Sequence, residues 1–176
     1  MNATIINDEV LYAADLVIEI DALDIEELKL KAKKNIRKRI RVCTHKDIEE
    51  NVHEMLIIHE QSCYVRPHKH TNKIESFHII EGEADVVLFH DDGSIDKVIK
   101  MGELRTGLKF YYRLPPSCFH TILIRSDVLV FHEVTNGPFK LEDTVLADWA
   151  PKETDVADVS LYLSEISNLI EKSTTK

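Results

Sequence analysis

The sequence has few residues of the kinds that mark disulfide-stabilised or membrane-spanning proteins. Its three cysteines, Cys43, Cys63 and Cys118, are odd in number and widely spaced, and no CxxC pair occurs. This argues against a disulfide framework and against a thiolate zinc site. No run approaches the roughly 20 apolar residues that a membrane span needs. The amino terminus lacks the basic start and apolar stretch of a signal peptide, so we expect a cytoplasmic protein.

Positive charge is scarce as well. The formal net charge is −9, and the main lysine and arginine tract lies between residues 29 and 41. This distribution argues against a nucleic-acid-binding surface and against binding to an anionic membrane. The expected partner is therefore a small-molecule ligand or substrate.

Glycine and proline, at five residues each, are too rare for flexible linkers, and no internal repeat occurs. A chain of 176 residues without such breaks predicts one compact domain. Within it we expect an N-terminal helical segment (1–40), a β-barrel (41–140), and a linker with a C-terminal helix (141–176).

The two helices are predicted from capping and periodicity. "DIEELKLKAKKNIRKRI" predicts a helix with Asp24 as N-cap and with Leu28, Ala32 and Ile36 on one face. Near the C-terminus, apolar residues recur at three- and four-residue intervals, which predicts an amphipathic helix that packs on its own barrel or on a second subunit. They are Val156, Val159, Leu163, Ile166 and Ile170.

Between Met55 and Val134 the pattern changes to short β-rich runs separated by hairpin signals such as "HDDGS". The runs follow one another at about ten-residue spacing, with no helical segment between them. This pattern favours an antiparallel sandwich or barrel over an α/β sheet. The predicted fold class is mainly β: a small antiparallel jelly-roll barrel with one helix at each end of the chain.

The stretch "YVRPHKHTNKIESFHIIEGE" contains a candidate metal site. His68 and His70 alternate on one strand face, where two imidazoles can hold the same ion. Glu75 starts the next β-run, and His120 starts a later one in "LPPSCFHTILI". Three imidazoles and one carboxylate suit one divalent transition metal, Fe, Zn, Mn, Ni or Co, and leave positions for water or substrate. The alternatives are a purely structural metal and a polar cluster held by hydrogen bonds.

Three further residues are candidates for catalysis or substrate binding. Arg66 shares the strand parity of His68, and its guanidinium could hold a carboxylate or phosphate or pair with a barrel glutamate. Tyr64, on the same parity, could position or protonate a substrate, or be a core tyrosine. Glu133 shares a face with apolar residues and could act as general base if burial raises its pKa, or it could end its strand.

These residues resemble the metal motifs of the cupins. The first motif, H-x-H-x4-E-x6-G, matches His68, His70, Glu75 and Gly82. The second motif, P-x-G-x-x-H, is similar to Pro115 to His120, with Ser117 in place of the glycine. Other departures are Ser62, where the first motif opens with glycine, and Ile124, where the second closes with asparagine.

More of the chain resembles one group of cupins. "VCTHKDIEENVHEML", "SCYVRPHKH", "FHEVTNGPF" and "DWAPKE" are similar to the WbuC family of cupin-fold metalloproteins, within residues 15–153. The resemblance implies a bacterial cytoplasmic protein associated with surface polysaccharide (O-antigen) gene clusters. We also expect a homodimer.

The sequence thus predicts a mononuclear metal-binding cupin. Our first hypothesis is a metal-dependent enzyme for a sugar or sugar-derived acid, of the isomerase or lyase type, or an Fe(II) dioxygenase. The second is a non-catalytic, metal-dependent sugar-binding or regulatory module. A metal-independent sugar epimerase is disfavoured, because its acid–histidine dyad has no use for a complete set of metal ligands.

Overall fold

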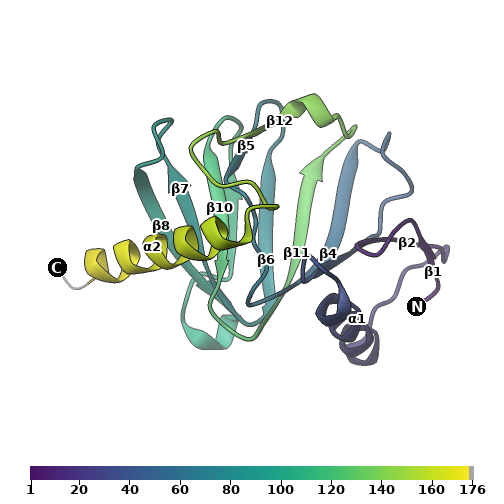
Figure 1. Cartoon of the computed structure of the whole chain (residues 1–176). Helices are drawn as coiled ribbons and strands as arrows, with labels where there is room; N and C mark the ends of the chain where they lie inside the picture. Colours follow the sequence, from purple (N-terminus) through teal and green to yellow (C-terminus); the bar gives the residue numbers. More distant parts are fainter. Residues whose placement is uncertain (175–176) are drawn as a thin grey trace.

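The computed structural model describes residues 1–174, whose strands form two sheets packed face to face with one helix outside each sheet (Figure 1). The helices are α1 (Ala22–Lys34) and α2 (Val156–Thr174). The larger sheet has the order β1 (Ala3–Ile5), β2 (Val10–Ala13), β3 (Arg39–Cys43), β4 (Val52–Glu60), β11 (Val128–Asn136), β6 (Glu75–Glu81) and β9 (Tyr111–Leu114). The smaller sheet has the order β12 (Thr144–Leu146), β5 (His68–His70), β10 (Phe119–Ile124), β7 (Glu83–Phe89) and β8 (Ile95–Gly102). Two short 3-10 turns cover Leu104–Thr106 and Leu141–Asp143.

The space between the sheets is filled by alternate residues of the strands. Phe131 on β11 lies opposite Ile57 on β4 and Ile79 on β6, and all three are buried. Ile122 and Ile124 of β10 join the same cluster from the smaller sheet. Because successive side chains of a strand point to opposite faces, the other residues of these strands point outward to the helices. The predicted mainly β fold with a helix at each end is confirmed.

Helix α1 covers the outer face of the larger sheet. Leu28 and Ala32 are buried against Leu56 and Ile58 of β4. The expected N-cap was wrong: Asp21 caps the helix, and its side chain accepts hydrogen bonds from the backbone N–H groups of Leu23 and Asp24. Asp24 is instead the N3 residue, and its carboxylate completes the capping box.

The helix also ends earlier than expected. Its C-cap is Asn35, so Ile36 follows the helix and is 96% exposed instead of buried on the sheet.

Helix α2 covers the smaller sheet of its own barrel, where Ile166 and Ile170 pack against Val87, Phe89 and Leu123 (Figure 1). The buried apolar stripe is shorter than the sequence pattern predicted, because Val156 at the start of the helix is exposed. Within the described residues, no helix is both long enough and apolar enough to cross a membrane.

The structure adds strands at both ends of the expected barrel. Residues 1–40 contain β1, β2 and the start of β3 as well as α1. The only parallel pair among the described strands is β2 with β3, which the crossover through α1 permits. Near the other end, β12 pairs with β5, so the linker is part of the smaller sheet.

Gly82 makes the tight turn between β6 and β7. Its φ of +89° lies in the left-handed region, and a Cβ atom there would lie 2.2 Å from the carbonyl oxygen of Val128. It would also lie 2.5 Å from Ser126 Oγ. Only glycine therefore fits this position without displacement of the β11 backbone.

Replacing Gly82 with Ala is expected to lower the free energy of unfolding by about 2 kcal/mol or more, measured by urea denaturation. Gly107→Ala is the matched control, because Gly107 has a φ of +76° but no atom near the added methyl group. It should cost about 1 kcal/mol, the conformational part alone. Equal losses in the two variants would contradict the role assigned to the close contact.

Candidate metal centre

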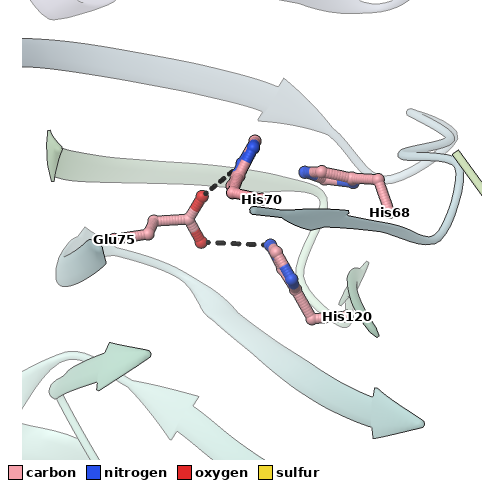
Figure 2. A group of neighbouring side chains, drawn as sticks. All are labelled: His68, His70, Glu75 and His120. Atoms are coloured by element: carbon pink, nitrogen blue, oxygen red, sulfur yellow. Dashed lines mark ion pairs between the residues drawn. The ribbon is translucent and has the colours of Figure 1, made fainter. Parts of the chain in front are cut away.

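The four predicted ligand residues lie together at one end of the barrel, between the two sheets (Figure 2). His68 and His70 come from β5, and His120 from β10, where it is the register partner of His68. Glu75 comes from the first position of β6 in the opposite sheet. One potential ligand atom from each residue lies within 4.8 Å of all the others.

The carboxylate of Glu75 faces two imidazoles. Its Oε2 atom lies 3.5 Å from Nε2 of His70, and its Oε1 atom lies 3.3 Å from Nε2 of His120. The His68 ring lies beside that of His120, with a centroid separation of 4.4 Å. Glu75 and His120 are buried, whereas His70 is 16% exposed at its side chain and marks the solvent side of the cluster.

Hydrogen bonds orient all three imidazoles. His68 Nδ1 lies 2.9 Å from the carbonyl oxygen of Arg66, and His120 Nδ1 lies 3.0 Å from that of Cys118. A carbonyl oxygen can only accept, so both Nδ1 atoms donate and the neutral rings keep their lone pairs at Nε2. His70 Nδ1 lies 3.1 Å from Thr144 Oγ1. Such partners on the far nitrogen fix the ring orientation of metal-binding histidines.

The residues fit a divalent transition metal. His120 Nε2 is buried and has no well-aligned hydrogen bond to any described residue, even though Glu75 is close. Because His120 Nδ1 faces the Cys118 carbonyl oxygen, Nε2 is the ring nitrogen whose lone pair can bind an ion when the ring is neutral. A buried lone pair of this kind, with two further imidazoles and a carboxylate, forms a donor set that suits a divalent transition metal.

The ionisation of the cluster favours a cation. Burial lowers the pKa of His68 to about 3, so this ring is neutral at neutral pH. Burial alone would raise the pKa of Glu75, but His120 and His70 outweigh it and hold that pKa well below its usual value. His120 shows the reverse balance: burial lowers its pKa, and Glu75 raises it above the usual value. Neutral His68 and ionised Glu75 are in the forms that bind metal ions, and metal binding requires the neutral form of His120 as well.

Tyr112 of β9 supports the carboxylate and was not predicted from the sequence. Its hydroxyl donates a 2.9 Å hydrogen bond to Glu75 Oε1. Burial and the charge of Glu75 raise the pKa of Tyr112 well above its usual value, so the hydroxyl keeps its proton. The available signal was the alternation in "YYRL", which turns Tyr112 and Leu114 inward.

Glu133 lies on the inner face of β11, near the cluster. It is the register partner of Phe77, and the next inward residue, Thr135, is the partner of Glu75. Burial and the nearby charge of Glu75 raise the pKa of Glu133 to about 8. A raised pKa is what an acid–base role of Glu133 requires, and the role itself stays a prediction.

Tyr64 and Arg66 do not join the four ligand residues. The Tyr64 hydroxyl donates to the carbonyl oxygen of Pro151 at 3.0 Å, and Arg66 Nη2 donates to that of Ala147 at 2.6 Å. Both side chains thus hold the linker before α2. Residues 63–67 are not a strand, so the alternation that relates His68 to His70 does not extend back to them.

Ser117, which stands where the second cupin motif has glycine, has a left-handed backbone conformation. Its φ is +70°, and its backbone N–H donates a 2.7 Å hydrogen bond to the carbonyl oxygen of His70. The loop before His120 is therefore tied to the strand that carries two other ligands. The cost is a non-glycine residue in the left-handed region, about 1 kcal/mol.

Comparison with known proteins gives a family model and several solved structures. A model described as "Domain of unknown function (DUF6016)" matches residues 20–101. No match was found among curated proteins. Protein SO0799 from Shewanella oneidensis is similar over 64% of this chain and 75% of that chain, with a TM-score of 0.52 and 11% identity.

Two other solved structures are similar over a smaller part of their own length. Oxalate decarboxylase from Bacillus subtilis matches 55% of this chain and 24% of that chain, at 20% identity and a TM-score of 0.44. CapF, in complex with 3-isopropenyl-tropolone, matches 60% of this chain and 31% of that chain, at 18% identity and a TM-score of 0.48. The likeness to SO0799 concerns the fold alone, and it agrees with the predicted single cupin barrel.

Ser117→Gly is expected to raise the free energy of unfolding by about 0.5–1 kcal/mol, because it removes the left-handed strain. The control is Ser62→Gly, the other position where a cupin-motif glycine is missing. Ser62 does not have a positive φ. Glycine there should leave stability unchanged or lower it, and a gain equal to that of Ser117→Gly would refute the argument.

The pKa of Glu133 predicts a pH-dependent stability in metal-free protein. Its folded pKa of about 8 is above the usual carboxyl value, so the folded state binds more protons and stability falls as pH rises from about 4.5 to 8. Glu133→Gln should remove this penalty and be more stable than wild type at pH 8, by about 1 kcal/mol or more, with no gain near pH 4. Denaturant unfolding at both pH values in the presence of a chelator tests this, and a gain of equal size at both would contradict it.

Proposed function

From the cupin fold and its three-histidine, one-glutamate cluster, we propose that the protein binds one divalent transition metal and is a metal-dependent enzyme for a small oxygen-rich substrate. The observation that carries this proposal is the convergence of four ligand atoms within 4.8 Å, with the three rings oriented from their far nitrogens. His68, His70, Glu75 and His120 would hold Fe, Zn, Mn, Ni or Co. When bound, the ion supplies a Lewis acid that polarises a hydroxyl or carbonyl oxygen.

We assign proton transfer to Glu133. Its support is a pKa of about 8, caused first by burial and then by the charge of Glu75. A carboxyl group with this pKa is protonated at neutral pH but gives up its proton readily, as a general acid must, and then acts as a base. Two carboxyl groups whose environments drive their pKa values apart, as for Glu75 and Glu133, are typical of acid–base sites.

A second candidate function is a metal-dependent binding or regulatory module without turnover. The observation that favours it is the position of Tyr64 and Arg66, whose polar groups contact Pro151 and Ala147 in the linker. Of the three residues expected to act on a substrate, this leaves Glu133 as the candidate beside the cluster.

The finer assignments come from the sequence resemblance to the WbuC family. We propose on that basis a sugar or a sugar-derived acid as ligand, a place in surface polysaccharide (O-antigen) biosynthesis, a cytoplasmic location and a homodimer. The buried position of the centre between two sheets suits a small-molecule ligand, and we propose neither nucleic acid nor membrane as partner.

Metal content tests the proposed function. Wild-type protein should retain about one divalent ion per chain after dialysis. A quadruple Ala variant at positions 68, 70, 75 and 120 should lose this ion, because all four ligand groups are removed. His78→Ala is the control, because His78 is exposed on the opposite face of β6. The measurement is elemental analysis, with circular dichroism to check folding. Retention of the full metal content by the quadruple variant would overturn the proposal.

A further inference from the structure

Lys73 is a buried cation that forms no close ion pair, although the carboxyl groups of Asp143, Glu133 and Glu75 lie near enough to act on its charge. It is 5% exposed, and its Nζ atom forms no ion pair or hydrogen bond with the described residues. Its Nζ atom lies over the ring of Phe139, 4.3 Å from the ring centroid. A buried ammonium group without a counter-ion is costly, and one aromatic face offsets only part of that cost.

Lys69 offers a contrast on the neighbouring strand. It also lies over an aromatic ring, Phe119, at 4.3 Å. Unlike Lys73, it forms an ion pair with Asp91 at 2.9 Å. Stacking on a ring therefore does not by itself explain why Lys73 has no acidic partner.

The loop that carries Lys73 is fixed on both sides. Asn72 Nδ2 donates to Asp143 Oδ1 at 3.0 Å, and the backbone N–H of Ile74 donates to Asn136 Oδ1 at 2.8 Å. Asn136 in turn donates through Nδ2 to the carbonyl oxygen of Asn72 at 3.2 Å. A lysine that only solvates a surface needs no such support, whereas a ligand-binding group benefits from a fixed position.

Lys73 and Thr135 both lie next to Glu75. Lys73 precedes Glu75 by two residues, and Thr135 is the register partner of Glu75 on β11. Thr135 is 8% exposed, and its Oγ1 atom is buried without a hydrogen-bond partner among the described residues. Thr135 thus lies beside Glu75, and Lys73 is near enough for its charge to act on the Glu75 carboxylate.

We infer that Lys73 and Thr135 form a carboxylate-binding subsite beside the metal centre, so that the ligand is a small hydroxy acid and not a neutral sugar. The inference rests on the proposed function, since the metal would hold the hydroxyl end of such a ligand. The charges agree with this choice. A divalent ion outweighs the single charge of Glu75, and Lys73 adds a positive charge that forms no close ion pair with the described side chains, although Asp143, Glu133 and Glu75 lie near enough to act on it.

The class of ligand follows from the geometry of the donors. A carboxylate accepts hydrogen bonds from an ammonium and a hydroxyl group at once, and these charge-assisted bonds are stronger than neutral ones. A neutral hydroxyl or amide oxygen would leave the charge of Lys73 unpaired. The subsite therefore distinguishes an acid from its uncharged analogue.

Binding of glycolate and of its neutral analogue glycolamide tests the inference. The protein is loaded with Co(II), and the visible absorption of the ion reports ligand binding at constant ionic strength. Glycolate should bind Lys73→Met at least about tenfold more weakly than wild type, and Thr135→Val several-fold more weakly. Lys73→Arg should retain most of the affinity, and Lys69→Met, the matched control, all of it. Glycolamide should bind the wild type and Lys73→Met equally weakly.

The outcomes separate this inference from the proposed function. Equal glycolate affinity in wild type, Lys73→Met and Thr135→Val, each with full cobalt content, overturns the carboxylate subsite and leaves the metal centre intact. A wild type that gives no spectral response to glycolate overturns it as well. Failure of the proposed function is a different result, since then the wild type would not take up cobalt through the four ligand residues.

Discussion

The centre depends on the packing of one sheet against the other over the apolar core. His68, His70 and His120 belong to the smaller sheet, and Glu75 to the larger one, so no single sheet contains the whole ligand set. The buried residues Phe77, Phe131 and Ile122 fill the barrel behind the cluster and hold the sheets at a fixed separation. Any change in that packing would move a carboxylate relative to three imidazoles, and metal binding tolerates only small displacements.

Hydrogen bonds fix the orientation of the ligand side chains, which the packing of the sheets alone does not determine. The Arg66 and Cys118 carbonyl groups and the Thr144 hydroxyl orient the rings, and Tyr112 holds the carboxylate. Thr144 comes from β12, which pairs with β5. The linker before α2 therefore serves the centre as well as connecting two elements.

Strand alternation was sufficient to predict the ligand set but not its surroundings. His68, His70, Glu75 and His120 lie within regular strands, where a period of two fixes the direction of each side chain. Tyr64 and Arg66 precede Pro67 in an irregular segment, so the same rule gave them a direction that the chain does not follow. Tyr112 and Lys73 have no motif of their own. Their importance comes from contacts with residues far along the chain, which no local pattern contains.

The helix boundaries show a similar limit. Asp21 and Asp24 are both acceptable caps by residue type, and the structure uses both in one capping box, with Asp21 as the N-cap and Asp24 as the N3 residue. The absence of a motif glycine also did not predict the backbone conformation at that position. Ser117 takes the left-handed conformation without glycine, because its backbone N–H is bound to His70, whereas Ser62 does not take it.

The two carboxyl groups of the barrel differ because their neighbours differ. Glu75 is surrounded by imidazoles and by a hydroxyl donor, which stabilise its charge. Glu133 lies two residues before Thr135, the register partner of Glu75, and no described hydrogen-bond donor stabilises its charge, so burial and the charge of Glu75 raise its pKa. An ion at the centre would reduce the repulsion between them and lower the pKa of Glu133 toward the neutral range. The same interaction that assembles the metal ligands would thus also adjust the acid–base group, since both depend on the charge of Glu75.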